Sequence, residues 1–350
     1  MQSVLSFLKR YSNALLKLLP LLAFAVPLLW LFLLDAGSFE LMWKGRTFQL
    51  FFIWLIALEL ILSWETIQPN KIDKRASSKT LALVAALLLP TVYVVTSNYL
   101  GLNTAIAEAA RQSGVTWWNS MALSTEFLVF AVLFCLMIYL QFGKKGLKDF
   151  SVPAFFLGIV GAIYTIDNVF PYGQFTPFQL FVPTTATLAA AVLNVMGYQT
   201  TLTTVSTMPR LTATDPVNPL RTATFEIAWP CAGIESFLIF TVVVLLFLKR
   251  MPISWKAKTA YFTVGAAVTY LINILRIAAF YPIGMDYGVN SEEVRLFHAY
   301  YGPLYSIAWI VAYPLIIFGS QSLWRKIAAR RSEKKPQGNK EKVNIYPKPN

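Results

Sequence analysis

Long hydrophobic runs, separated by short polar stretches, recur along most of the chain. An α-helix needs ~20 predominantly apolar residues to cross a bilayer. The pattern therefore predicts an all-α fold, a polytopic membrane helical bundle of about eight transmembrane spans. The predicted spans are 14–34, 48–66, 80–100, 121–142, 152–170, 231–248, 258–281 and 299–319. A further run, 178–198, is interrupted by Pro183, Asn194 and Gly197, and we expect it to form one re-entrant or interfacial helix.

The placement of positive charge gives this arrangement an orientation. With the N-terminus inside, most of the 30 Lys and Arg residues fall in inside loops or in the C-terminal segment. We expect a multi-pass protein of the cell membrane with both termini cytoplasmic. Residues 1–323 form the membrane-embedded domain, and 324–350 are predicted to be a basic, disordered cytoplasmic tail. The run Ala14–Leu34 is too long for a signal-peptide core, so it is predicted to be retained.

Composition supports the same class. Hydrophobic residues make up 56% of the chain and charged residues only 13%, about half the share of a soluble domain. The net charge of +13 lies mainly beside the hydrophobic runs, which indicates topology and anionic lipid and not a nucleic-acid partner. Of the two cysteines, Cys135 lies mid-span and is interpreted as inert packing, whereas Cys231 lies at the boundary of a span.

Three reactive side chains are predicted to meet at one membrane face. Lys249 and Arg250 mark the inner end of span 231–248, which places Cys231 at its extracytoplasmic end. The next two spans bring Arg276 and His298 to the same level. A thiol, a cation and an imidazole are the groups that thiol acyl transfer requires. Each has a simpler interpretation: a small or lipidated cysteine, a snorkelling arginine, and an interfacial polar histidine.

Other polar residues are secondary candidates. Asn273 lies three residues before Arg276 and therefore on the same helix face. Glu226 and Glu235 flank the cysteine, and Asp167 ends the fifth span, so these three are candidates for a substrate-binding vestibule. His298 is the only histidine, and no residues have zinc-ligand spacing, so neither a metal nor another cofactor is expected.

These residues resemble the signatures of the exosortase and archaeosortase family. The sequence CAGIES, from Cys231, is similar to the family's C-S/A-G-I-x-S motif. Asn273-Ile-Leu-Arg276 resembles its Asn-x-x-Arg motif, and His298 with Gly302 resembles the start of its last span. The resemblance covers about 226–305. Ala232 stands where many bacterial members have serine, and the threonine-rich approach to the cysteine favours an archaeal-type member.

The resemblance implies a cysteine protein-sorting transpeptidase. Its partner would be a secreted protein with a C-terminal tripartite sorting signal: a short motif, a hydrophobic span and a basic cluster. Cys231 would be the nucleophile, His298 the general acid and base, and Arg276 the stabiliser of the thiolate or oxyanion, with Asn273 orienting it. An amine-bearing membrane lipid would accept the acyl group. The sequence does not define an oligomeric state.

Three other classes stay open from the sequence alone. A secondary transporter would use the interrupted run 178–198 and the carboxylates of Glu59, within a span, and Glu126, at the start of the fourth span. An intramembrane cysteine protease would share the nucleophile but end in hydrolysis. A non-catalytic assembly factor would be indifferent to substitution of the three residues.

Overall fold

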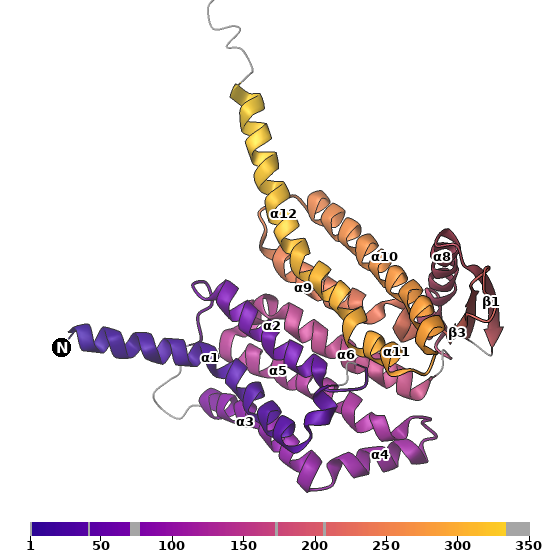
Figure 1. Cartoon of the computed structure of the whole chain (residues 1–350). Coiled ribbons are helices and arrows are strands. Elements are labelled where there is room, and N and C mark those ends of the chain that lie inside the picture. The colour runs from indigo at the N-terminus through magenta and orange to yellow at the C-terminus, as the bar shows by residue number, and fades with distance from the viewer. Residues whose placement is uncertain (1, 41–42, 71–77, 172–173, 206–207, 334–350) are drawn as a thin grey trace, which may run out of the picture.

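The protein is described by a computed structural model that covers residues 2–40, 43–70, 78–171, 174–205 and 208–333 (Figure 1). It is mostly helical, as predicted. The long helices are α1 Gln2–Leu34, α2 Thr47–Ser63, α3 Ser78–Tyr99, α5 Met121–Asp149, α6 Ser151–Val169, α9 Ile234–Arg250, α10 Trp255–Tyr287 and α12 Gly302–Glu333. The shorter helices are α4 Leu102–Gln112, α7 Thr176–Gln179, α8 Val182–Val195 and α11 Glu292–Leu296.

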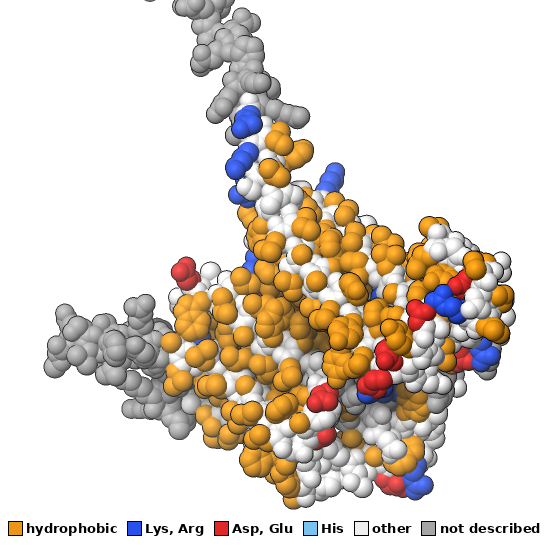
Figure 2. Space-filling view, viewed as in Figure 1, with side chains coloured by type: hydrophobic (Ala, Val, Ile, Leu, Met, Phe, Trp, Pro, Cys, Tyr) orange, Lys and Arg blue, Asp and Glu red, His pale blue; other side chains and the backbone are white. Residues whose placement is uncertain are grey.

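Six helical segments in the described part of the chain are long and apolar enough to cross a membrane. They correspond to six of the predicted spans, and the other two are the 17-residue helices α2 and α9. A helix of that length is about 26 Å long, close to the ~30 Å hydrocarbon thickness, so the predicted count of eight is approximate. Figure 2 shows hydrophobic side chains covering the long helices of one face, with charged side chains gathered near the sheet and α11.

Two helix groups pack side by side (Figure 1). The first contains α1, α2, α3, α5 and α6, whose core is rich in aromatic rings. Phe24 lies at its centre, edge-on to Phe52 and Phe130, with ring centroids 5.4 Å away in both cases. Each such pair contributes about 0.5–1.5 kcal/mol beyond its buried area. The second group contains α9, α10 and α12, which approach closely at Gly265, where a side chain would collide with Tyr313 and Phe240.

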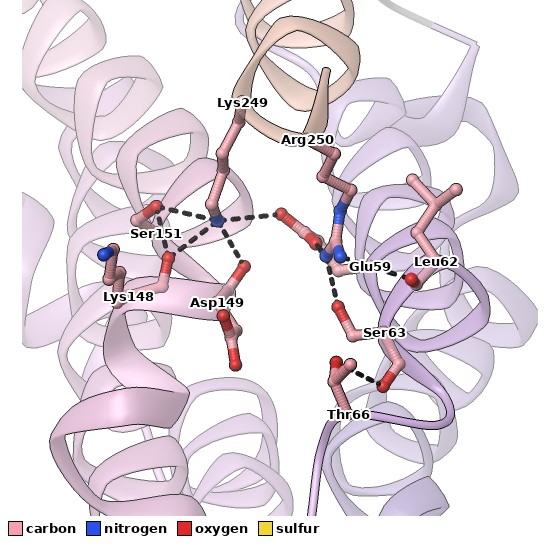
Figure 3. Close-up of polar contacts among 9 residues, drawn as sticks. All are labelled: Glu59, Leu62, Ser63, Thr66, Lys148, Asp149, Ser151, Lys249 and Arg250. Atoms are coloured by element: carbon pink, nitrogen blue, oxygen red, sulfur yellow. Dashed lines mark hydrogen bonds and ion pairs between the residues drawn. The ribbon is translucent and has the colours of Figure 1, made fainter. Parts of the chain in front are cut away.

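A polar cluster joins the two groups at the inner end of α9, the end predicted to be cytoplasmic (Figure 3). Lys249 Nζ lies 3.3 Å from Glu59 Oε1 on α2 and donates to the carbonyl oxygens of Lys148 and Asp149, both at 2.7 Å. Arg250 pairs with the other oxygen of Glu59. Because Glu59 is fully buried, the two cations neutralise a charge that could not stay unpaired in an apolar interior.

The other buried carboxylate is also paired. Glu126 on α5 accepts hydrogen bonds from Arg46 at 2.9 and 3.0 Å and from Gln49 at 2.5 Å. Glu59 and Glu126 are the residues on which a transporter would depend, and each is occupied in joining helices. Neither carboxylate of these two residues is therefore free to bind a transported ion.

Glu59→Ala is expected to lower the free energy of unfolding by about 2–3 kcal/mol, because it leaves Lys249 and Arg250 facing each other unpaired. The loss is smaller than for a fully buried pair, since these cations are 25% and 27% exposed. Thermal denaturation in detergent measures it as a fall in midpoint. Glu108→Gln, which removes an exposed partner of Arg111, is the control and should leave the midpoint unchanged. Equal midpoints for Glu59→Ala and wild type would contradict the structural role.

A small antiparallel sheet was not predicted. Its strands are β1 Gln199–Val205, β2 Met208–Thr214 and β3 Thr222–Glu226, in the order β1-β2-β3. Residues alternate between buried and partly exposed along β2, and the buried face packs on α8 and α10. Within 199–225, the alternation of threonines with apolar residues is typical of half-buried strands.

Two helices, α8 and α12, define the extent of predicted segments that were not full spans. Run 178–198 contains α8, which has 14 residues and a length of about 21 Å, too short to cross as a full span. At the C-terminus, α12 is helical to Glu333, so its helix continues into the segment predicted to be disordered from residue 324. Residues 334–350 of that segment lie outside the described part of the chain.

Candidate active site

Cys231 lies in a short turn between the sheet and the membrane-spanning helices. The turn, η3 Trp229–Ala232, follows β3 and precedes α9. Pro230 therefore opens a 3-10 turn and not α9 itself, which begins at Ile234 and is capped by Gly233. Gly233 has a φ of 95°, a left-handed conformation that glycine adopts without strain. The predicted span 231–248 thus begins three residues before the helix, which starts at Ile234.

Asn273 on α10 holds this turn. Its Nδ2 donates a hydrogen bond of 3.0 Å to the backbone carbonyl of Cys231. A Cβ added at Gly233 would lie 2.9 Å from Asn273 Cγ, so glycine is required for the approach as well as for the φ value. Asn273 was expected to orient Arg276, but its observed hydrogen bond is to the cysteine. This hydrogen bond fixes the position of the Cys231 backbone, from which the thiol side chain extends.

Arg276 lies one turn further along α10. Its aliphatic stem packs against Gly302 at the start of α12, where an added Cβ would lie 3.0 Å from Arg276 Cδ. Its charge interacts with the Cys231 thiol and with the Glu235 carboxyl. Within the described residues no carboxylate lies at ion-pair distance from Arg276, and its Nε has no hydrogen-bond partner there. A half-buried cation in that condition is available to a developing negative charge.

His298 is carried by an irregular turn. Residues Phe297–Tyr301, labelled η4, form a π-helical turn between α11 and α12. Such turns are rare and are frequent at functional sites, because they redirect side chains that an α-helix would place elsewhere. The His298 ring lies 5.4 Å from the Phe280 ring on α10, centroid to centroid. Ser236 and Ser306, 3.2 Å apart, join α9 to α12 below it.

The three predicted residues line one cavity. Cys231, Arg276 and His298 come from η3, α10 and η4 and share a hollow of about 100 Å³. The other lining residues come from the end of β3 and from α10: Phe225, Glu226, Ile227, Ile277, Phe280 and Tyr281. The sequence therefore placed these side chains together correctly.

The secondary candidates divide between this cavity and other positions. Glu226 lines the cavity and pairs with Arg210 of β2 at 2.6 Å. Glu235 interacts with the charge of Arg276 but does not belong to the cavity wall.

Asp167 does not reach the cavity, so its prediction as a vestibule residue is not supported by its position. It accepts a 2.9 Å hydrogen bond from Trp229 Nε1 and pairs with Lys44 Nζ, also at 2.9 Å. Lys44 in turn lies over the Trp117 ring, 3.1 Å from its centroid. Because Trp229 belongs to the turn of Cys231, this network anchors the turn to α6. Trp229 and Lys44 were not among the residues predicted from the sequence.

A second, larger cavity lies next to the same turn. It has a volume of about 320 Å³ and is almost wholly apolar. Its walls include Ala232 and Gly233, which follow the cysteine directly, together with Phe181, Phe237 and Tyr270. Consecutive residues at this turn therefore face two cavities: one that contains the thiol, the cation and the imidazole, and one that is almost wholly apolar. Among the described residues, no group of three His, Cys, Asp or Glu side chains is arranged to hold a metal ion.

The fold and this site define a multi-pass membrane protein with a thiol-containing polar site at one end of its bundle. A family model described as transmembrane exosortase matches residues 42–318, well over half of the chain. The protein belongs to the transmembrane exosortase family, and is in general terms a membrane sorting enzyme. Comparison with curated proteins and with solved structures finds no match.

Proposed function

We propose that this protein is a cysteine transpeptidase that removes the C-terminal sorting signal of secreted proteins and transfers them to a membrane lipid amine. The observation that carries the proposal is the shared cavity of Cys231, Arg276 and His298. Family membership supports a sorting enzyme, and the distribution of Lys and Arg supports an extracytoplasmic site with both termini in the cytoplasm.

In the first step the Cys231 thiolate attacks the carbonyl carbon of the scissile peptide bond. Negative charge develops on the carbonyl oxygen, and the Arg276 guanidinium, whose charge acts on the thiol region, stabilises it. The C–N bond then breaks, and His298 gives a proton to the departing amine. The products of this step are a thioester on Cys231 and a free C-terminal segment.

In the second step an acceptor amine attacks the thioester. His298, now neutral, takes a proton from that amine, and the C–S bond breaks to regenerate the thiolate. One amide bond has been exchanged for another, so no energy source or cofactor is consumed. An ethanolamine-type lipid headgroup is an acceptor of suitable chemistry, since it presents a primary amine at the membrane surface.

A groove within the membrane offers a place for the hydrophobic span of the sorting signal. It lies between α2, α9 and α12 and has a volume of about 520 Å³. Ile239, Val243 and Phe247 line it along one face of α9, and Ile307 to Phe318 line it along α12. A substrate helix in this groove would lie parallel to α9 and point its outer end toward Cys231.

Mass spectrometry of substrate C-termini tests the reaction. A secreted protein with a tripartite C-terminal signal is co-expressed with the wild-type protein or without it. We expect a shortened terminus with the added mass of a lipid amine, present only with the enzyme. A shortened terminus ending in a free carboxylate would indicate the alternative, a cysteine protease that ends in hydrolysis. An unshortened terminus for every tripartite substrate tried would contradict both.

A further inference from the structure

Strand β3 leads directly into the turn of Cys231, and one of its two edges is used by β2. Ile227 N donates to Pro209 O at 2.9 Å, and Asp215 N donates to Arg221 O at 3.0 Å. Both pairs belong to the register in which Leu211 faces Phe225. In an antiparallel ladder every second residue bonds to a given neighbour. The backbone N–H and C=O groups of Thr222, Thr224 and Glu226 therefore point away from β2.

The edge that these groups form is open within the described residues. β3 is the last strand of the sheet, and no backbone hydrogen bond is made there to Thr224 or Glu226 from outside the sheet. Helix α10 packs under the face of β3 and not along its edge, with Gly284 closely approaching Phe225 and Ala223. The side chains of Thr222, Thr224 and Glu226 are exposed. An unpaired edge of this kind is a template for another extended chain.

This edge runs into the candidate active site. Glu226, the last residue of the free edge, lines the same cavity as Cys231 and His298, together with its neighbours Phe225 and Ile227. A strand added to β3 would lie about 4.8 Å from it and would continue into that cavity.

We propose that the free edge of β3 binds the extended segment of the substrate that precedes the scissile bond, as a fourth strand of the sheet. This inference rests on the proposed function and adds the subsite that orients the peptide. Main-chain hydrogen bonds to Thr224 and Glu226 hold the segment whatever its sequence, and pockets for alternate side chains supply selectivity. The Arg210–Glu226 pair stands where the added strand enters the cavity, so it selects among polar side chains at that position.

Cysteine cross-linking tests the pairing without requiring catalysis. The protein carries Cys135→Ala, Cys231→Ala and Thr224→Cys, and is co-expressed with a secreted protein that has a tripartite C-terminal signal. Single cysteines are placed at consecutive positions of the stretch before its hydrophobic span. We expect disulfides at every second position, because only alternate side chains of an added strand share a face with residue 224. Cross-links at no position, or at all positions equally, would overturn the inference.

Thr201→Cys in the same background is the matched control. Thr201 pairs with Thr212, and Thr212 pairs with Thr224, so the two positions lie in one row of the sheet but on opposite outer strands. Residue 201 is expected not to cross-link to the substrate. Equal cross-linking from residues 201 and 224 would indicate contact with the sheet face and not pairing at the edge.

A second variant measures the backbone contribution in the active protein. Thr224→Pro removes an outward N–H without breaking the ladder to β2, and we expect processing to slow about five- to tenfold. Thr224→Val removes only the hydroxyl that bonds to Thr212 and should process normally. If the wild-type protein processes substrate but the Thr224→Cys variant shows no alternation of cross-links, the β3 edge has no part in the mechanism, while the transpeptidase proposal stands. If the Thr224→Cys variant shows alternating cross-links but the wild-type protein processes no substrate, the peptide subsite at β3 stands and the transpeptidase proposal fails.

Discussion

Cys231→Ala is expected to abolish processing, with a loss of at least ~10³-fold, because the thioester cannot form without the thiol. Cys231→Ser should be nearly as inactive, because a serine hydroxyl ionises far less readily than a thiol and so supplies no comparable nucleophile. The fold should survive both changes, because Asn273 bonds to the backbone carbonyl of residue 231 and not to its side chain. The measurement is the fraction of substrate with a shortened terminus, together with hydroxylamine release of substrate trapped on the protein.

The second cysteine provides a matched control. Cys135 lies within α5, in the helix group away from the site, and Cys135→Ala should process substrate at the wild-type rate. Normal processing by well-expressed Cys231→Ala would exclude thioester chemistry at this residue. Loss of processing in Cys135→Ala but not in Cys231→Ala would assign the reaction to a different thiol.

Arg276→Met is expected to lower kcat about 10²- to 10³-fold, because the cation acts on charge that develops in the transition state. Arg276→Lys should retain part of the activity, because lysine keeps the positive charge. It should not restore full activity, because an ammonium group cannot reproduce the planar set of guanidinium donors. Gly302→Ala should also slow the reaction, because the added Cβ would lie 2.8 Å from Phe297 O, in the turn of His298, and 3.0 Å from Arg276 Cδ. Single-turnover acylation of Cys231 measures the step directly.

A second readout separates this role from a structural one. Arg276→Met should slow the alkylation of Cys231 by iodoacetamide at neutral pH, because less of the thiol is then thiolate. Arg111→Met, which removes an exposed cation far from the cavity, should change neither rate. Unchanged alkylation and acylation in Arg276→Met would show that the arginine only packs between α10 and α12.

Much of this architecture could be predicted from hydrophobicity alone. The bilayer imposes a single length on apolar helices, and most of the predicted spans are helices with similar bounds. The grouping of Cys231, Arg276 and His298 followed from counting spans and charges, because residues at the same end of neighbouring helices must lie at one level. Span ends were less exact: α10 continues past the predicted end at 281, through Pro282, to Tyr287.

The predictions that differ from the structure depend on side-chain directions and tertiary contacts, which hydrophobic periodicity does not encode. Asp167 was predicted to line a vestibule, but its side chain contacts Trp229 and Lys44 and does not line the cavity. Asn273 was placed on the correct helix face, but its bond to Cys231 depends on the left-handed turn at Gly233. The sheet was missed because its strands are short and polar on one face, a weaker signal than a long apolar run.

The pairing of Glu59 with Lys249 and Arg250 has a consequence for which substrates fit. It fixes one end of α9 at a constant depth, and Cys231 lies just beyond the other end. Helix α9, with 17 residues and a length of about 26 Å, therefore sets the distance between the Glu59 cluster and the turn of Cys231. Under the proposed function, a sorting signal that lies beside α9 is expected to reach Cys231 with its scissile bond only when its hydrophobic span has a similar length. We expect signals of longer or shorter span to be processed more slowly.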